Sequence, residues 1–292
     1  MLSKLSIILQ TNERQKMNIA IIGLGLMGGS LALSLQKLDF VQSVVGIDHN
    51  PQHQEDALKL KLVEKIINFE DIHLYDVIFL AIPVNGVIAT LKKLVDIPQN
   101  TTIIDLGSTK ELIVKSVPQE IRKNFVAAHP MTGTENFGPY AAIEGLYKDK
   151  VVVLCDLEES GEAQAKVARK IFKALGMNKH FMGSHQHDRH AAFISHMPHA
   201  ISYSIANTVM KQEQKHNILA LAAGGFRSMS RLAKSSPNMW EDIFRQNKTN
   251  LLEAIELFET ELQGLKKNIQ NDEWEKVHQN MVDGNKLHDI LD

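Results

Sequence analysis

A glycine-rich turn near the start of the chain constrains its fold more than any other feature. The sequence Gly-Leu-Gly-Leu-Met-Gly directly follows the apolar run 18–22 and opens an amphipathic helical pattern. In this strand–turn–helix context, G-x-G-x-x-G is typical of a dinucleotide-binding unit, because its glycines allow a tight turn, close approach of the backbone to a pyrophosphate and close helix–strand packing. The helix N-terminus adds free N–H groups and a positive dipole end. We therefore expect the cofactor's phosphates to bind at Gly23, Gly25, Leu26, Met27 and Gly28.

An acidic residue stands where such a unit contacts the adenosine ribose. Asp48 ends the apolar run 44–48 and lies 20 residues after Gly28. A carboxylate at this place accepts hydrogen bonds from the ribose hydroxyls and repels a 2′-phosphate, which favours NAD over NADP. The alternative is a glycine turn in an α/β protein that binds no nucleotide, with Asp48 as a helix cap.

Short apolar runs alternate with helical patterns through the first half of the chain. Further strands are predicted at 77–81, 102–105, 125–128 and 151–154, with helices such as 27–38, 84–95 and 159–175 between them. Runs that are apolar on both faces are typical of parallel strands covered by helices. The pattern therefore predicts an α/β fold with a Rossmann-type, doubly wound sheet.

The second half of the chain changes character near Gly183. From residue 188 onward there is almost no β-prone run, and helices are predicted at 191–210, 239–265 and 273–291. We expect three parts: an N-terminal extension at 1–16, because Met17 directly precedes the first strand, a dinucleotide-binding Rossmann domain at 17–184, and an all-helical domain for substrate binding and dimerisation at 185–292.

Composition excludes several classes of partner. The 32 basic and 34 acidic residues give a net charge of −2, so no basic field indicates binding to nucleic acid or to an anionic membrane. No apolar run approaches the roughly 20 residues that span a bilayer. The single Cys155 excludes a disulfide within the chain and favours a reducing, cytoplasmic setting. Histidines gather at 185–190, but no H-E-x-x-H spacing or thiolate pair supports a metal site, and we expect none.

Polar side chains follow the predicted strands at their carboxyl ends, where open α/β sheets bind ligands. Ile82 and Pro83 form a tight strand exit that we expect to line the cofactor. Ser108 follows the next strand, and His129 the one after it. A histidine facing a nicotinamide can take the proton of a hydroxyl as hydride leaves its carbon, and Ser108 can orient that imidazole. The alternatives are that Ser108 caps the helix near Glu111 and that His129 binds only backbone.

The helical half carries a second polar cluster. His196 and His199 stand within one turn of an otherwise apolar helix. Arg227 and Arg231 are four residues apart, which places them on one face of a helix. Arginine is the usual bidentate partner of a carboxylate, although an arginine pair more often forms a solvated basic face.

With these residues assembled, the chain resembles the prephenate dehydrogenase family of tyrosine biosynthesis. The motifs that carry the resemblance occur in the family's order from Met17 onward: GLGLMGGSLA at 23–32, DLGSTK at 105–110, HPMTGTE at 129–135, HDRHAAFISHMPHA at 187–200 and GGFRSMSRLA at 224–233, with Trp240 after SSPNM. The resemblance implies an NAD-dependent oxidative decarboxylation of prephenate to 4-hydroxyphenylpyruvate, and a homodimer built on the helical domain.

The resemblance also implies roles for single residues. His129 hydrogen-bonds the ring hydroxyl and accepts its proton, Ser108 orients both, and Arg231 binds a substrate carboxylate. The substrate site is bordered by His199, Thr134, Glu135, Trp240 and Arg227. Arg227-Ser228 replaces the Lys-Asp of some members, which leaves the choice between prephenate and the amino acid arogenate open.

Three other functions remain alternatives to a prephenate dehydrogenase. An arogenate dehydrogenase has the same fold, and Glu135 offers the acidic group that an amino substrate needs. Another β-hydroxyacid dehydrogenase needs a catalytic lysine on the helical domain, for which the sequence offers no compelling candidate. A non-enzymatic, NAD-responsive regulator needs neither the base His129 nor the carboxylate-binding Arg231.

Overall fold

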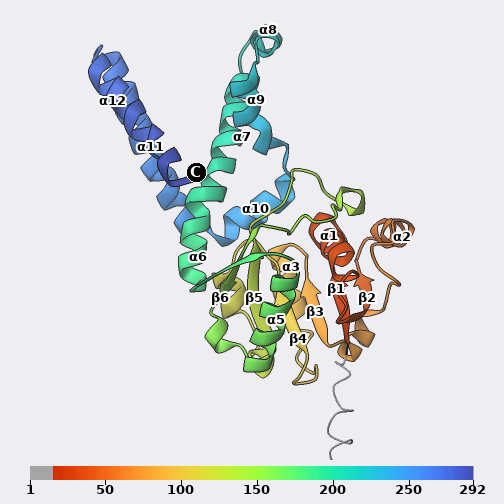
Figure 1. The fold of residues 1–292 in the computed structure, drawn as a ribbon. Coiled ribbons are helices and arrows are strands. Elements are labelled where there is room, and N and C mark those ends of the chain that lie inside the picture. Colours follow the sequence, from red (N-terminus) through yellow and green to blue (C-terminus); the bar gives the residue numbers. More distant parts are fainter. Residues whose placement is uncertain (1–15, 292) are drawn as a thin grey trace, which may run out of the picture.

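The computed structural model describes residues 16–291, so all but Lys16 of the predicted extension lies outside it. Its first half is a seven-stranded sheet with the order β2-β1-β3-β4-β5-β6-β7 (Figure 1). The strands are β1 Met17–Ile22, β2 Val41–Ile47, β3 Val77–Leu80, β4 Thr102–Asp105, β5 Phe125–Pro130, β6 Val151–Cys155 and β7 Asn178–Met182. This order confirms the predicted Rossmann-type sheet, with a change of winding direction between β1 and β3.

Helices cover both faces of this sheet because its strands are apolar on both sides. In β1, Ile19 and Ile21 pack with the helices α1, α2 and α5, whereas Ala20 and Ile22 pack with α3 and α4. The helices of this half are α1 Leu26–Leu35, α2 Pro51–Lys59, α3 Val84–Leu91, α4 Glu111–Lys115 and α5 Glu162–Ala174. Short 3₁₀ turns connect them at η1 Phe69–Leu74, η2 Gln119–Ile121, η3 Pro139–Ala141 and η4 Leu157–Glu159.

The sheet is mostly parallel, as the apolar runs indicated, but one edge departs from this pattern. Strand β6 pairs antiparallel with β5, and β7, which was not predicted, pairs parallel with β6. The sequence of β7 lacks a strand signal because it lies at the edge of the sheet, where Asn178, His180 and Phe181 are exposed. Its pairing therefore depends on backbone hydrogen bonds to β6 more than on burial of its side chains.

The second half of the chain is helical, as predicted, and rises from the sheet as two arms (Figure 1). Its helices are α6 Ser184–Ala191, α7 Met197–Met210, α8 Lys215–Ala220, α9 Gly224–Ser230, α10 Pro237–Gln246, α11 Lys248–Gln270, α12 Trp274–Asn285 and α13 His288–Leu291, with a 3₁₀ turn η6 at Arg231–Lys234. A π-helical turn, η5 Ala192–His196, joins α6 to α7. Within residues 16–291 there is no helix of the length and apolarity that a membrane span requires.

The helical half contacts the sheet domain through α10. Asp242 of α10 accepts hydrogen bonds from the backbone N–H and the side-chain amide of Asn85, at the start of α3. Gln246, one turn further along α10, accepts a hydrogen bond of 3.2 Å from Thr109, in the loop after β4. These contacts place α10 beside the carboxyl ends of β3 and β4, the edge at which the sheet domain is predicted to bind its ligands.

Candidate active site

The glycine turn after β1 has the geometry of a phosphate cradle. Gly23 has φ +96°, and a Cβ there would lie 2.3 Å from the carbonyl oxygen of Ala81, beside Ile82. A Cβ on Gly28 would lie 1.8 Å from the carbonyl oxygen of Gly23, so only glycine lets α1 approach the strand this closely. A Cβ on Gly25 would meet nothing nearer than 3.9 Å. The turn is therefore closely packed against neighbouring backbone at Gly23 and Gly28. It is open at Gly25, where a bound pyrophosphate needs room.

Two further features suit this turn to a dinucleotide. No side chain caps the N-terminus of α1, so the N–H groups of its first turn are available to an anion. Asp48, which directly follows β2, is buried and accepts a hydrogen bond of 2.8 Å from the backbone N–H of Leu24. The carboxylate thus fixes the turn itself, and it lies where the ribose hydroxyls of a nucleotide are expected. Asp48 accepts a second hydrogen bond, of 2.9 Å, from the N–H of Asn50.

The long connection between β5 and β6 lies against α1. The hydroxyl of Tyr147 donates a hydrogen bond of 2.8 Å to the carbonyl oxygen of Met27, and the N–H of Ile143 donates one of 2.8 Å to the hydroxyl of Ser30. Because this connection covers α1, most of the helix is buried rather than amphipathic. The segment that carries Thr134 and Glu135 is thereby attached to the helix that begins at the glycine turn.

His129 lies on β5, one residue before its end, and its partner is another histidine. Its Nδ1 is 2.8 Å from Nε2 of His187, which α6 supplies from the helical half. Burial, followed by the nearby His187 and Lys110, holds the pKa of His129 well below its ordinary value. The imidazole is therefore neutral at neutral pH, which is the form that a proton acceptor needs.

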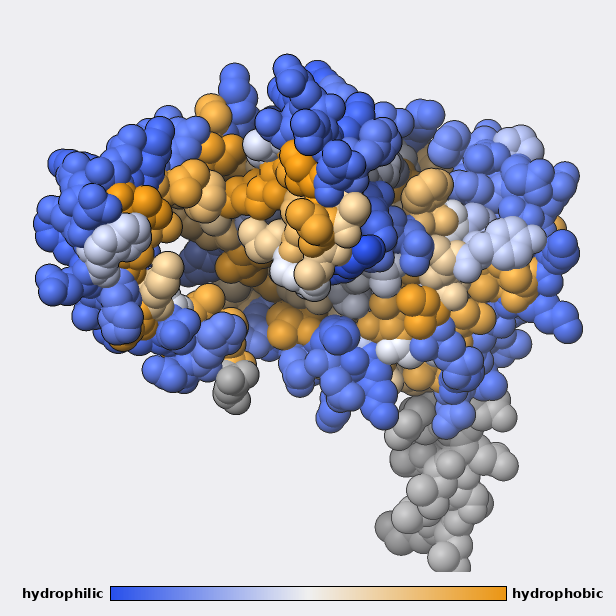
Figure 2. All heavy atoms as spheres, turned by 90° about the horizontal axis from the view of Figure 1, so that it is seen from above, coloured by the Kyte–Doolittle hydropathy of each residue, from blue (hydrophilic) through white to orange (hydrophobic). Residues whose placement is uncertain are grey.

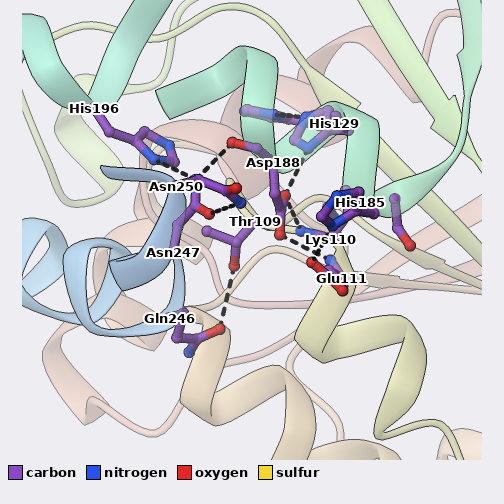
Figure 3. Close-up of polar contacts among 12 residues, drawn as sticks. Thr109, Lys110, Glu111, His129, His185, Asp188, His196, Gln246, Asn247 and Asn250 are labelled. Atoms are coloured by element: carbon purple, nitrogen blue, oxygen red, sulfur yellow. Dashed lines mark hydrogen bonds and ion pairs between the residues drawn. The ribbon is translucent and has the colours of Figure 1, made fainter. Parts of the chain in front are cut away.

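Asp188 connects this histidine pair to α4. Its Oδ1 is 2.8 Å from Nδ1 of His187, and its two carboxylate oxygens accept hydrogen bonds of 2.7 and 2.9 Å from the backbone N–H groups of Lys110 and Glu111 (Figure 3). Asp188 therefore caps α4, the role that the alternative interpretation gave to Ser108. The other alternative was that His129 binds only backbone, and the contact of its ring with His187 contradicts it.

A buried ion pair lies beneath the two histidines. The ammonium group of Lys110 contacts the carboxylate of Asp105, and both side chains are fully buried. Lys110 also donates a hydrogen bond of 2.9 Å to the carbonyl oxygen of Ala128, the residue before His129. Burial raises the pKa of Asp105, and the ammonium of Lys110 opposes that rise. The pair thus fixes the end of β5 and places positive charge near His129.

The π-helical turn places His196 and His199 in different surroundings. His196 is buried, and its Nδ1 lies 3.0 Å from the amide of Asn247, which also donates a hydrogen bond of 2.7 Å to the carbonyl oxygen of Asp188. Burial lowers the pKa of His196 to about 4. The ring of His199 stacks on Trp240 instead, and its Nδ1 lies 2.9 Å from the carbonyl oxygen of Ser195. π-Helical turns such as η5 bend a helix locally and are frequent at functional sites.

The predicted carboxylate-binding arginine faces the connection between β5 and β6. Arg231 begins η6, and its guanidinium lies 3.8 Å from the carboxylate of Glu135. Burial, and to a smaller extent the positive charge of Arg231, lowers the pKa of His199. Arg227 is exposed and donates to the carbonyl oxygen of Ala222. Thr134 is also exposed.

Sequence reasoning missed the partners of His129. His187 was noticed only as part of a histidine-rich segment and a family motif, and Lys110 and Asn247 were given no role. The available signal was the pair His187-Asp188 inside HDRHAAFISHMPHA, which spacing alone does not connect to His129. No hydrogen bond joins Ser108 to His129 among the described residues, and within that part of the chain no group of three His, Cys, Asp or Glu side chains could hold a metal ion.

Together, the sheet, the glycine turn and the neutral histidine define a two-domain dinucleotide-dependent oxidoreductase. A family model described as "Prephenate dehydrogenase, nucleotide-binding domain" matches residues 31–180, and one described as "Prephenate dehydrogenase, dimerization domain" matches residues 183–283. The chain belongs to the prephenate dehydrogenase family.

Individual relatives agree with this assignment. A prephenate dehydrogenase of Bacillus subtilis (strain 168) is 30% identical over 274 residues, which are 91% of this chain and 73% of that protein. A cyclohexadienyl dehydrogenase of Zymomonas mobilis is 31% identical, over 85% of this chain and 87% of its own length. The solved prephenate dehydrogenase of A. aeolicus, in complex with hydroxyphenyl propionate and NAD+, is 29% identical with a TM-score of 0.89, over 96% of this chain and 100% of that one. Synechocystis arogenate dehydrogenase is 26% identical with a TM-score of 0.79, over 94% and 100% of the two chains.

Proposed function

We propose that this protein catalyses the NAD-dependent oxidative decarboxylation of prephenate to 4-hydroxyphenylpyruvate, a step of tyrosine biosynthesis. The observation that carries the proposal is the half-buried His129 at the carboxyl end of the sheet, whose Nδ1 lies 2.8 Å from Nε2 of His187, in a chain of this family. The A. aeolicus relative was solved with NAD+ and a hydroxyphenyl compound, which are the cofactor and the type of ring that the proposal requires.

The residues of this chain divide the work between binding and proton transfer. Bound NAD supplies the hydride acceptor, and the glycine turn, the N-terminus of α1 and Asp48 would hold it. His129 accepts the proton of the ring hydroxyl, so that the oxygen can form a double bond to carbon as the ring is oxidised. Because loss of carbon dioxide makes the ring aromatic, the protein has mainly to position the substrate, supply one base and match its charge.

Arg231 is our candidate for the substrate carboxylate. Its guanidinium is within reach of Glu135, at 3.8 Å, but the two are not in direct hydrogen-bond contact. A carboxylate of the substrate would therefore gain a partner whose present ion pair is weak. His199, Thr134, Trp240 and Arg227 are proposed to border the same site, with Ser108 orienting the hydroxyl, and Ile82 and Pro83 lining the cofactor beside the glycine turn.

The contact between Glu135 and Arg231 also bears on the choice of substrate. Arogenate carries an ammonium group where prephenate carries a keto group, and Glu135 is the acidic side chain that could bind it. In this structure Glu135 faces the cation of Arg231, which reduces the negative charge available to an ammonium group. We therefore propose prephenate as the preferred substrate, with arogenate as the second candidate.

We also propose that the helical domain forms a homodimer. Helix α11 has 23 residues, yet only Leu251 and Ala254 are buried in a single copy, and Val277 alone is buried in α12. Figure 2 shows hydrophobic side chains gathered around a hollow in the helical part of the molecule. Large apolar side chains exposed there include Met210, Leu221, Met229, Leu257, Leu262, Trp274 and Met281. Patches of this kind mark interfaces, and the family model for this region is described as a dimerization domain.

The proposed domain boundary separates the residues that bind the cofactor from those that bind the substrate and form the dimer. We propose that residues 17–184 bind the cofactor and that residues 185–292 bind substrate and a second copy of the chain, in the cytoplasm.

Analytical ultracentrifugation tests the proposed dimer. A Leu221→Glu, Leu262→Glu double variant should sediment as a monomer, whereas Leu74→Glu, an exposed change on the sheet domain, should not alter the mass.

The function itself is tested with purified protein, NAD and either prephenate or arogenate, by following NADH absorbance and the release of carbon dioxide. We expect turnover with prephenate, and slower turnover or none with arogenate. Faster turnover of arogenate would reverse the substrate assignment. Absence of NADH formation with both compounds would overturn the proposed function.

A further inference from the structure

The side chains of His129, His187 and Asp188 form one continuous hydrogen-bonded row. Nδ1 of His129 is 2.8 Å from Nε2 of His187, and Nδ1 of His187 is 2.8 Å from Oδ1 of Asp188. His187 and Asp188 are buried and come from α6, whereas His129 comes from β5, so the row joins the two halves of the chain. The ring planes of the two histidines meet at 66°, edge to face rather than stacked.

The row determines which nitrogen of each ring carries the proton. Asp188 already accepts two backbone N–H bonds, so its carboxylate acts as an acceptor and Nδ1 of His187 must be the donor. Neutral His187 then has a lone pair on Nε2, and Nδ1 of His129 must donate to it. As a result, Nε2 of His129 carries the lone pair, and no hydrogen bond engages it among the described residues.

We propose that His187 is a positioning residue: it holds His129 in the Nδ1–H tautomer and takes that proton when the substrate's hydroxyl proton arrives on Nε2 of His129. This inference rests on the proposed function. The proton count balances, because Nε2 of His129 gains one proton while its Nδ1 passes one to Nε2 of His187. The product of the transfer is a neutral His129 beside an imidazolium of His187 that is paired with the carboxylate of Asp188.

The charges around the row favour this final state. A positive charge on the ring of His129 is opposed first by burial and then by the nearby His187 and Lys110, which hold the pKa of His129 well below its ordinary value. His187 instead touches the carboxylate of Asp188. The transfer therefore moves the proton toward the carboxylate of Asp188.

Other titratable groups also face the row, and any pH profile contains their effects. Lys110 approaches from the loop before α4, Asp105 from the end of β4 and His196 from η5. Lys110 and Asp105 are paired with each other, and burial holds the pKa of His196 at about 4.

Two variants separate the parts of the proposal. His187→Gln places an amide close to the position of Nε2, which can accept the bond from His129 but cannot take its proton. His187→Phe removes both functions and keeps the ring volume. His190→Gln is the matched control, since His190 is an exposed histidine of the same helix.

Kinetics provide the first measurement, with folding and NAD affinity checked in each variant. We expect His187→Phe to lower kcat about 10²–10³-fold at nearly constant KM for prephenate, because His129 then loses both the partner that fixes its tautomer and the acceptor of its Nδ1 proton. His187→Gln should fall between His187→Phe and the unmodified protein and should shift the acid limb of kcat against pH, whereas His190→Gln should match the unmodified protein. An unchanged kcat and pH profile in both His187 variants would overturn the proposal.

The second measurement does not depend on turnover. In ¹⁵N-histidine-labelled protein, protonated and unprotonated ring nitrogens resonate far apart, and the spectrum of a His129→Asn variant assigns the His129 signals. We expect the proton on Nδ1 of His129 in the unmodified protein and redistribution toward Nε2 in His187→Phe. A proton on Nε2 in the unmodified protein would refute the inference even if the enzyme turns over prephenate. Conversely, the predicted tautomer in a protein inactive on prephenate would refute only the proposed function.

Discussion

The imidazole of His199 lies against the indole of Trp240, with ring centroids 3.5 Å apart and planes inclined by 22°. Nε1 of Trp240 is buried and has no hydrogen-bond partner within the described part of the chain. A buried donor without an acceptor is costly, so native proteins usually provide it with a partner. The stacked pair therefore contains an N–H group that no other described residue uses, next to His199, which is proposed to border the substrate.

Trp240→Phe should separate the stacking from the donor. Phenylalanine keeps an aromatic surface for His199 and removes only the N–H group, so we expect KM for prephenate to rise about fivefold, the equivalent of a neutral hydrogen bond of about 1 kcal/mol. Steady-state kinetics at saturating NAD provide the measurement. An unchanged KM would show that the substrate makes no contact with Nε1.

Asp48→Asn should weaken the preference for NAD. The amide oxygen can still accept the hydrogen bond from Leu24, so the glycine turn is retained, but the charge that repels a 2′-phosphate is lost. We expect the ratio of kcat/KM for NAD to that for NADP to fall, chiefly because kcat/KM for NADP rises when the 2′-phosphate is no longer repelled. Equal use of both cofactors by the unmodified enzyme would contradict the role given to Asp48.

Arg231→Ala should act on substrate binding. The side chain of Arg231 is 56% exposed, so its contact with a carboxylate should contribute a binding free energy near the low end for charge-assisted hydrogen bonds, about 1.4 kcal/mol. We therefore expect KM for prephenate to rise roughly tenfold while kcat changes little. Arg245→Ala, an exposed arginine of α10 that pairs with Glu241, is the control and should leave KM unchanged. If both variants behave alike, Arg231 belongs to the solvated surface.

His129→Asn should remove the base. We expect kcat to fall roughly 10²–10⁴-fold, the usual range for a lost general base, while the affinity for NAD barely changes. Only neutral imidazole accepts a proton, and the pKa of His129 is lowered by burial, so the rate of the unmodified enzyme should decline only at pH values well below 6.5. A folded His129→Asn protein with most of its kcat and the same acid limb would place the base elsewhere, with His199 as the next candidate.

His196 should make the fold sensitive to acid. Its pKa is about 4 in the folded protein and about 6.5 when unfolded, so between these pH values the unfolded chain binds more protons and stability falls as the pH falls. The full effect is about 3 kcal/mol, reached near pH 4. Urea unfolding at pH 7 and pH 5 measures it: the unmodified protein should lose more stability between the two than His196→Gln does. Identical losses would exclude His196 as the source.

The parts of the site that sequence reasoning predicted are those fixed by short-range rules. The glycine turn follows from steric limits at Gly23 and Gly28, and strands such as β1 from runs that are apolar on both faces. Strand β7 could not be predicted, because an exposed edge strand carries no such run. The cap of α4 could not be predicted either, because Asp188 is 77 residues from Glu111 in the sequence.

The same limit applies to the roles of single side chains. The position of His129 at a strand end indicated a base, but its partner lies 58 residues away on another domain. Which of Ser108 and His187 orients the imidazole depends on how α6 packs against α4, and no local pattern in the sequence encodes that packing. Family resemblance supplied roles for Arg231 and Trp240 that their spacing left open.

The two hydrogen bonds from Lys110 and Glu111 to Asp188 have a consequence for how this enzyme can change. One carboxylate both caps the start of α4 and contacts the histidine row, so on the proposed mechanism we expect a mutation at Asp188 to alter thermal tolerance and turnover together. A fragment that ends before α6 would also keep the cofactor turn and His129 but lose His187. On the proposed mechanism neither half of the chain is a complete catalyst, and exchanging helical halves between homologues would transfer part of the acid–base apparatus along with the proposed substrate pocket.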